Sequence, residues 1–151
     1  MFDSDTLTWA GKKIVLLQLF ATCTWSIAQP GWLTLVGNPG EPQNDLVQVN
    51  PVSRSGSADT PTLNLRINRA NLRTSWDNVP YRSYTATVEI DCIEKTARYT
   101  EISFYMMPLW EGKPHRTTSF SSTEMRPLRF RDIEPNPTSR LIRAACPTPL
   151  R

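Results

Sequence analysis

The chain has 151 residues, a length that predicts one domain with a modest core rather than two domains. Its charged fraction of 21% and its 13 prolines indicate an ordered, loop-rich domain and exclude a disordered one. The net charge is only +3, and the arginines are spread from Arg54 to Arg151 instead of forming a stripe, so we expect no nucleic-acid partner. We interpret these arginines as a solvated face or else as a weak docking surface for an acidic partner.

The N-terminal segment predicts export through the inner membrane. Lys12 and Lys13 precede the apolar run Ile14–Ala28, which ends in small residues. This order is typical of a secretory signal peptide over residues 1–28, with Gln29 as the first mature residue. The run is too short to span a bilayer comfortably. The alternative to a signal peptide is a buried N-terminal helix. We therefore expect a single mature domain over residues 29–151, without a transmembrane span, in the periplasm or at the outer-membrane surface.

The three cysteines have different predicted fates. The residues before Cys23 match a lipobox at one position only, which favours cleavage after Ala28 over a lipid anchor on Cys23. The mature chain then holds only Cys92 and Cys146, which we expect to form a disulfide in an oxidising compartment. The bridge would close a loop of about 55 residues and stabilise the fold by up to about 4 kcal/mol. With the single His115, these cysteines make no four-ligand metal set.

The central feature of the mature chain is a predicted hairpin over Tyr81–Met107, with its turn at Ile93–Thr96. Apolar side chains recur at every second position in both halves. In the first half they are Tyr84, Ala86, Val88, Ile90 and Cys92, and in the second Ile102, Phe104 and Met106. This period of two predicts antiparallel strands with one apolar face that the rest of the chain covers.

Shorter strands are expected on both sides of this hairpin. The predicted strands are Gly31–Gly37, Leu46–Asn50 and Leu63–Ile67 before it, and His115–Ser121 and an extended piece at Leu128–Ile133 after it. The polar segment Pro51–Pro61 predicts a surface loop, and Asn68–Pro80 predicts either a further short strand or a wide turn.

The C-terminal region changes to a helical pattern. Leu141, Ile142, Ala145 and Cys146 fall on one face at spacings of three and four, and Asn136 or Thr138 can cap the helix. Because a helix this short is marginal alone, the disulfide would hold it against the sheet. The predicted fold class is therefore α+β, an antiparallel sheet of about five or six strands with one C-terminal helix tethered by a disulfide.

Several short motifs resemble the surface-adhesin protein E-like family of proteobacterial exported proteins. They are GWLTLVG at 31–37, PYRS at 80–83, VEIDC at 88–92, SFYMMP at 103–108 and AAC at 144–146. The resemblance covers about residues 31–147 and implies a six-stranded antiparallel sheet with a disulfide-tethered helix. In the best-known member it also implies an outer-membrane adhesin that binds host extracellular-matrix proteins and plasminogen. PLWEGKP at 108–114 replaces the family's glycine-rich turn, and the leader has only a poor lipobox, whereas the family's archetype is a lipoprotein.

No catalytic motif is recognisable, so we predict neither an enzyme nor a cofactor. A nucleophile elbow is missing near His115, and the carboxylates of the hairpin (Glu89, Asp91, Glu94 and Glu101) are expected on its solvent face. Haem ligation by His115 with Met106 or Met107 is an alternative that an absorbance scan after haem titration tests.

The candidate partner-binding residues are basic or aromatic and lie on predicted loops. They are Lys113, His115, Arg116 and Trp110, followed by the arginines Arg126, Arg129 and Arg131. The predicted function is that of an exported, non-enzymatic, adhesin-like binding protein for host matrix proteins or plasminogen. The alternative is a periplasmic accessory protein that binds an envelope partner or a small ligand.

Overall fold

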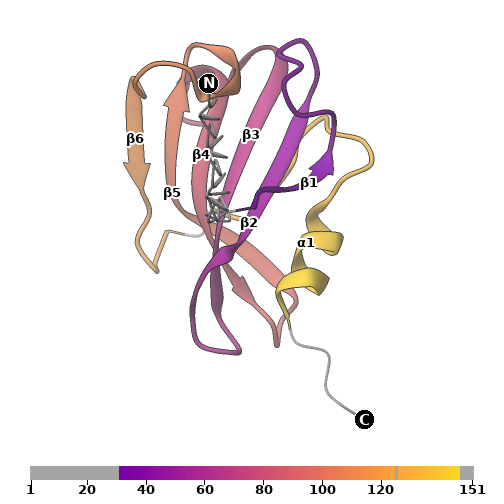
Figure 1. The fold of residues 1–151 in the computed structure, drawn as a ribbon. Helices are drawn as coiled ribbons and strands as arrows, with labels where there is room; N and C mark the ends of the chain where they lie inside the picture. The colour runs from indigo at the N-terminus through magenta and orange to yellow at the C-terminus, as the bar shows by residue number, and fades with distance from the viewer. Residues whose placement is uncertain (1–30, 125, 147–151) are drawn as a thin grey trace, which may run out of the picture.

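A computed structural model describes residues 31–124 and 126–146, with the side chains of 51–54 excepted. The predicted signal peptide, Cys23 and the cleavage site at Gln29 lie outside the described residues. The described chain forms one six-stranded antiparallel sheet whose strands follow each other in sequence order (Figure 1). The strands are β1 (Leu33–Val36), β2 (Leu46–Gly56), β3 (Pro61–Thr74), β4 (Pro80–Asp91), β5 (Thr96–Tyr105) and β6 (Arg116–Ser119). A short 3-10 helix, η1 (Pro108–Trp110), precedes β6, and the helix α1 (Thr138–Ala145) follows it.

The predicted central hairpin is confirmed as β4 and β5. Ala86 pairs with Ile102 and Tyr84 with Phe104, and these four side chains are buried on one face of the sheet. The expectation that Met106 continues this face is wrong, since its side chain is 46% exposed. Strand β5 ends at Tyr105, so the alternation that would turn Met106 toward the core stops one residue earlier.

The prediction of a surface loop over Pro51–Pro61 is wrong in its extent. Strand β2 continues to Gly56 and β3 begins at Pro61, so the connection is only residues 57–60. Backbone pairing between strands needs no apolar side chains, and a polar hairpin end therefore gives no periodic signal. Gly56 has a φ of 91°, and the Ser57 hydroxyl accepts a hydrogen bond from the Thr60 N–H at 3.0 Å, which closes the turn.

The segment after Asn68 is the continuation of β3 to Thr74 rather than a separate short strand or a wide turn. Its pairing with β4 shifts register between Asn68 and Arg73, which marks an irregularity of the bulge type. Arg69 occupies the position where the alternation of Leu65 and Ile67 requires a core residue, and it is buried. Because Arg69 is charged, it interrupts the alternation of apolar side chains by which a strand is recognised in a sequence.

Helix α1 and its disulfide agree with the predicted C-terminal unit. Leu141, Ile142 and Ala145 are buried in the same core as the sheet, and Cys146 is bonded to Cys92, with their Cα atoms 5.4 Å apart. The Asn136 side-chain oxygen accepts a hydrogen bond from the backbone N–H of Thr138 at 3.1 Å, although Pro137 occupies the N-cap position. The helix lies at the β1 side of the sheet, away from β6 (Figure 1).

The return segment, residues 126–137, carries the chain from β6 back across the core face to α1. The predicted extended piece Leu128–Ile133 forms no strand, and an isolated bridge to Arg98 of the sheet is made by Pro127, the residue before it. The side chains of Leu128, Phe130 and Ile133 are buried in the core, so the segment packs onto the sheet largely through its side chains. No helix within the described residues has the length and apolar character that crossing a membrane requires.

Candidate binding site

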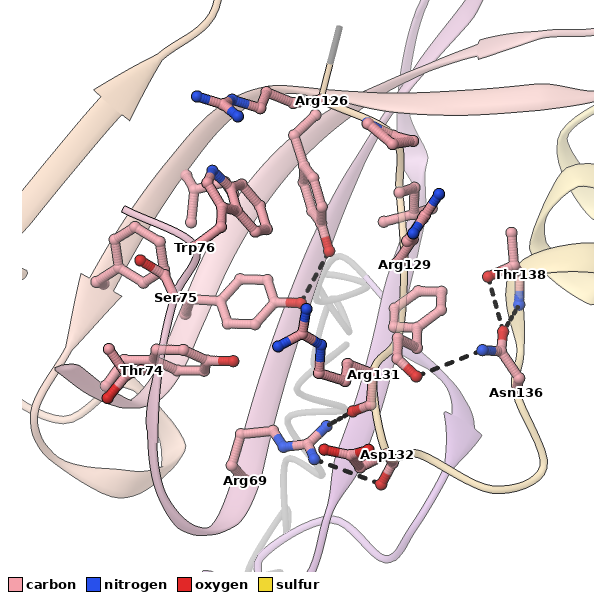
Figure 2. Close-up of a pocket in the computed structure, with 18 of the residues that line it drawn as sticks. Arg69, Thr74, Ser75, Trp76, Arg126, Arg129, Arg131, Asp132, Asn136 and Thr138 are labelled. Atoms are coloured by element: carbon pink, nitrogen blue, oxygen red, sulfur yellow. Dashed lines mark hydrogen bonds between the residues drawn. The ribbon is translucent and has the colours of Figure 1, made fainter. Parts of the chain in front are cut away.

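A cavity of about 640 Å³ lies between the core face of the sheet and the return segment. Figure 2 shows Arg69 and Asp132 at one end of this hollow, Arg126 at the other end and Arg131 between them. Aromatic side chains of β4 and β5 form much of its wall. The volume falls within the range of about 300–1,000 Å³ that is usual for small-molecule sites.

Tyrosine side chains give the cavity its polar centre. The hydroxyls of Tyr84 and Tyr99 are 2.9 Å apart and hydrogen-bonded, and the ring of Tyr81 packs edge-on against Tyr84 at 5.4 Å. Burial raises the pKa values of all three tyrosines, Tyr81, Tyr84 and Tyr99. The pKa of Tyr84 lies well above its usual value. These phenols are therefore neutral at physiological pH and act as hydrogen-bonding groups in an aromatic surrounding.

Arg69 ties the return segment to the sheet. Its guanidinium donates hydrogen bonds to the backbone carbonyls of Arg131 at 2.9 Å and Asp132 at 3.4 Å. Its Nε lies 3.5 Å from a carboxylate oxygen of Asp45, so the buried charge has a counterion. Arg69 is only 3% exposed and serves mainly as a structural clamp for the cavity.

The other arginines leave the mouth of the cavity positively charged. Arg126 pairs with Asp77 at 3.4 Å, and Asp132 pairs with Arg73 at the same distance. Among the described residues, the guanidinium groups of Arg129 and Arg131 form no ion pair and no hydrogen bond, although both line the cavity. The unpaired charge at the mouth favours an anionic group.

Three of the predicted binding residues line a second hollow of about 570 Å³. His115 and Arg116 meet Glu124 there, and Arg126 belongs to both this hollow and the first cavity. The two basic clusters that are separate in the sequence are therefore neighbours in space. Lys113 is exposed and lines neither hollow.

Trp110 lies apart from these basic residues. Its indole N–H points to the backbone carbonyls of Ile67 at 3.2 Å and Tyr84 at 3.0 Å. The guanidinium of Arg66 is stacked between Trp110 at 4.4 Å and Trp32 at 4.2 Å. The side chain is half-buried and holds η1 against the sheet, and its role in partner binding stays a prediction.

Two of the hairpin carboxylates that could imitate a catalytic pair, Glu89 and Asp91, have structural partners. Glu89 forms an ion pair with Arg98 at 2.9 Å, and one oxygen of Asp91 accepts the backbone N–H groups of Ile93 and Glu94 at the turn. In the part of the chain that the structure describes, no group of three His, Cys, Asp or Glu residues could hold a metal ion.

A comparison of the sequence with models of protein families identifies a family for this chain. The model described as surface-adhesin protein E matches residues 32–147. The chain belongs to the surface-adhesin protein E family. The match covers the whole sheet, the return segment, α1 and both cysteines of the bridge. Membership of the surface-adhesin protein E family implies an exported, adhesin-like surface protein. Neither the comparison with curated proteins nor that with solved structures found a match.

Proposed function

We propose that this member of the surface-adhesin protein E family is a non-enzymatic binding protein that attaches to protein partners through a basic rim. The basic rim consists of Lys113, His115 and Arg116 together with Arg126 and Arg129. The observation that carries this proposal is the position of Arg126, which lines both hollows and so joins the two basic clusters.

The exposure of the basic rim suits an electrostatic contact. Lys113, His115, Arg116 and Arg129 are exposed, and of these only Arg129 lines the cavity under the return segment. Clustered exposed charges steer an acidic partner and raise its association rate, and this effect weakens as salt screens it. The partners that fit are acidic surfaces of host extracellular-matrix proteins, such as vitronectin or laminin, or plasminogen.

The test is the binding of the purified protein to immobilised vitronectin, laminin and plasminogen at physiological salt. We expect saturable binding that weakens several-fold in a Lys113→Gln/Arg116→Gln variant. A Lys95→Asn/Arg143→Gln variant is the control, since it removes the same charge from exposed positions remote from the rim. Equal loss in both variants, or affinity no greater than that of an unrelated basic protein, would contradict the proposal.

The alternative location, in the periplasm with an envelope partner, needs its own experiment. Intact cells are treated with protease, and released peptides are identified by mass spectrometry with a periplasmic protein as the control. Release of peptides from 31–146 while the periplasmic protein stays intact supports the adhesin function. Full protection supports a periplasmic accessory protein.

A further inference from the structure

The cavity beneath the return segment is a built feature rather than loose packing. The backbone N–H of Tyr99 donates to the Arg126 carbonyl at 2.8 Å, and that of Leu128 donates to the Ala97 carbonyl at 2.8 Å. At the other end, Arg69 holds the carbonyl of Arg131. The return segment is thus fixed on both sides of the cavity, so a ligand would meet preformed walls and the ordering cost of binding would be small.

The walls of this cavity combine an apolar surface with a single polar centre. Tyr81, Tyr84 and Phe104 form a cluster of rings with centroids 5.4–6.1 Å apart, and Ile102 adds an aliphatic surface. Trp76 stands at the edge of the cavity, 45% exposed and 5.8 Å from the ring of Tyr99. Such a wall suits the apolar body of a ligand better than a polar one.

The cavity is lined by more positively charged than negatively charged side chains. Four arginines face it, against the carboxylates of Asp132 and Glu134. Asp132 is already paired with Arg73, which lies outside the lining. Arg131 extends into the middle of the hollow (Figure 2), and Arg129, two residues earlier on the return segment, also lines it.

We infer that this cavity binds a small amphipathic anion, a molecule with an apolar body and one acidic group, with Arg131 and Arg129 holding the acidic group. The apolar body would lie against the rings of Tyr81, Tyr84 and Phe104. A carboxylate or sulfonate suits the guanidinium groups because each can accept two parallel hydrogen bonds. This site shares Arg126 and Arg129 with the basic rim, but it takes a small molecule between the sheet and the return segment rather than the surface of a protein.

The probe is dodecanoate, titrated below its micelle concentration into the purified protein and followed by calorimetry. Dodecyltrimethylammonium has the same chain with the opposite charge and serves as the ligand control. We expect saturable binding of one dodecanoate per chain and at least about tenfold weaker binding of the cation. A change in tryptophan fluorescence that accompanies binding should disappear in Trp76→Phe, while the calorimetric affinity persists.

The matched variants separate the cavity from general surface charge. Arg129→Gln/Arg131→Gln should weaken dodecanoate binding about tenfold or more, whereas Arg143→Gln on the exposed face of α1 should leave it unchanged. Thermal melting of each variant confirms that the fold is retained. No saturable binding of dodecanoate, equal binding of the cation, or an unchanged affinity in the double variant would overturn the inference. Matrix-protein binding is tested separately by the Lys113→Gln/Arg116→Gln variant, whose two residues do not line this cavity and which should bind dodecanoate as the wild-type protein does.

Discussion

The phenolic oxygens of Tyr84 and Tyr99 lie 2.9 Å apart inside the core and share a hydrogen bond between β4 and β5. The register opposes Tyr84 to Phe104 rather than to Tyr99, so the two long side chains reach each other diagonally across the sheet. At least one of the two must keep its proton for the hydrogen bond to exist. Burial in an aromatic surrounding is what keeps that proton in place.

The tyrosine pair predicts a loss of stability in alkali. Both folded-state pKa values lie above the ordinary value of 10.0, so the unfolded chain releases these protons first as the pH rises. The free energy of unfolding should stay level through neutral pH and fall above about pH 10, by up to about 1.4 kcal/mol per pH unit for each tyrosine. Urea denaturation between pH 7 and 11 measures it. A Tyr84→Phe/Tyr99→Phe variant should show a shallower slope, and an equal slope would contradict the assignment.

The bridge between Cys92 and Cys146 should contribute substantially to stability. Its cysteines are 54 residues apart, and replacing both by alanine should lower the free energy of unfolding by about 2–4 kcal/mol. Urea denaturation of the variant, compared with the wild-type protein with and without reductant, gives the value. Alkylation of the denatured, unreduced protein should leave both positions unmodified, and a modified Cys92 peptide would show that the bridge is absent in solution.

Asn68 should be among the least replaceable polar residues. Its buried amide donates to the carbonyls of Pro42 and Asn44 at 3.1 and 2.8 Å and accepts the Leu109 N–H at 2.9 Å. Asn68→Asp keeps the shape but turns a carboxylate oxygen toward two carbonyls, which should lower the free energy of unfolding by about 3 kcal/mol or more. Asn71→Asp, at an exposed position of the same strand, should change it by less than about 0.5 kcal/mol. Equal losses in chemical denaturation would contradict this role.

Trp110 and Trp76 should respond differently to the same change. Trp110→Phe removes the N–H that the Ile67 and Tyr84 carbonyls accept, so we expect a loss of about 1–2 kcal/mol in the free energy of unfolding. Trp76→Phe removes no hydrogen bond to the described residues and, at a position that is 45% exposed, should cost less than about 0.5 kcal/mol. Chemical denaturation of both variants tests the difference. If Trp110→Phe weakens partner binding without losing stability, Trp110 is a contact residue instead of a support.

The sequence predicts those parts of the fold in which burial follows a simple period. The hairpin of β4 and β5 shows alternation, and α1 shows spacings of three and four, because each packs one face against the core. The disulfide follows from the presence of only two cysteines in the predicted mature chain. Strand β3 beyond Asn68 could not be predicted, because Arg69 stands on the core face and its burial depends on carbonyls of the return segment 62 residues away.

The candidate site was predicted less completely than the fold. The sequence points to His115, Arg116 and Arg126 as basic residues, but only the return of the chain across the sheet brings them together. The buried tyrosine pair has no local signal either, since Tyr84 and Tyr99 look like ordinary core aromatics. The sequence does contain one indication of the role of Arg69. It follows Leu65 and Ile67 at a spacing of two residues, which places a basic side chain on the core face of the strand.

The strand order has a consequence for the assembly of the chain. Each strand pairs with its neighbour in sequence, so the sheet can grow by adding one hairpin at a time as the chain is delivered from its N-terminus. Cys146 follows all six strands in the sequence, so the second cysteine of the bridge is the last part of the described fold to emerge. The bridge to Cys92 can therefore close only after every strand of the sheet is present in the emerged chain.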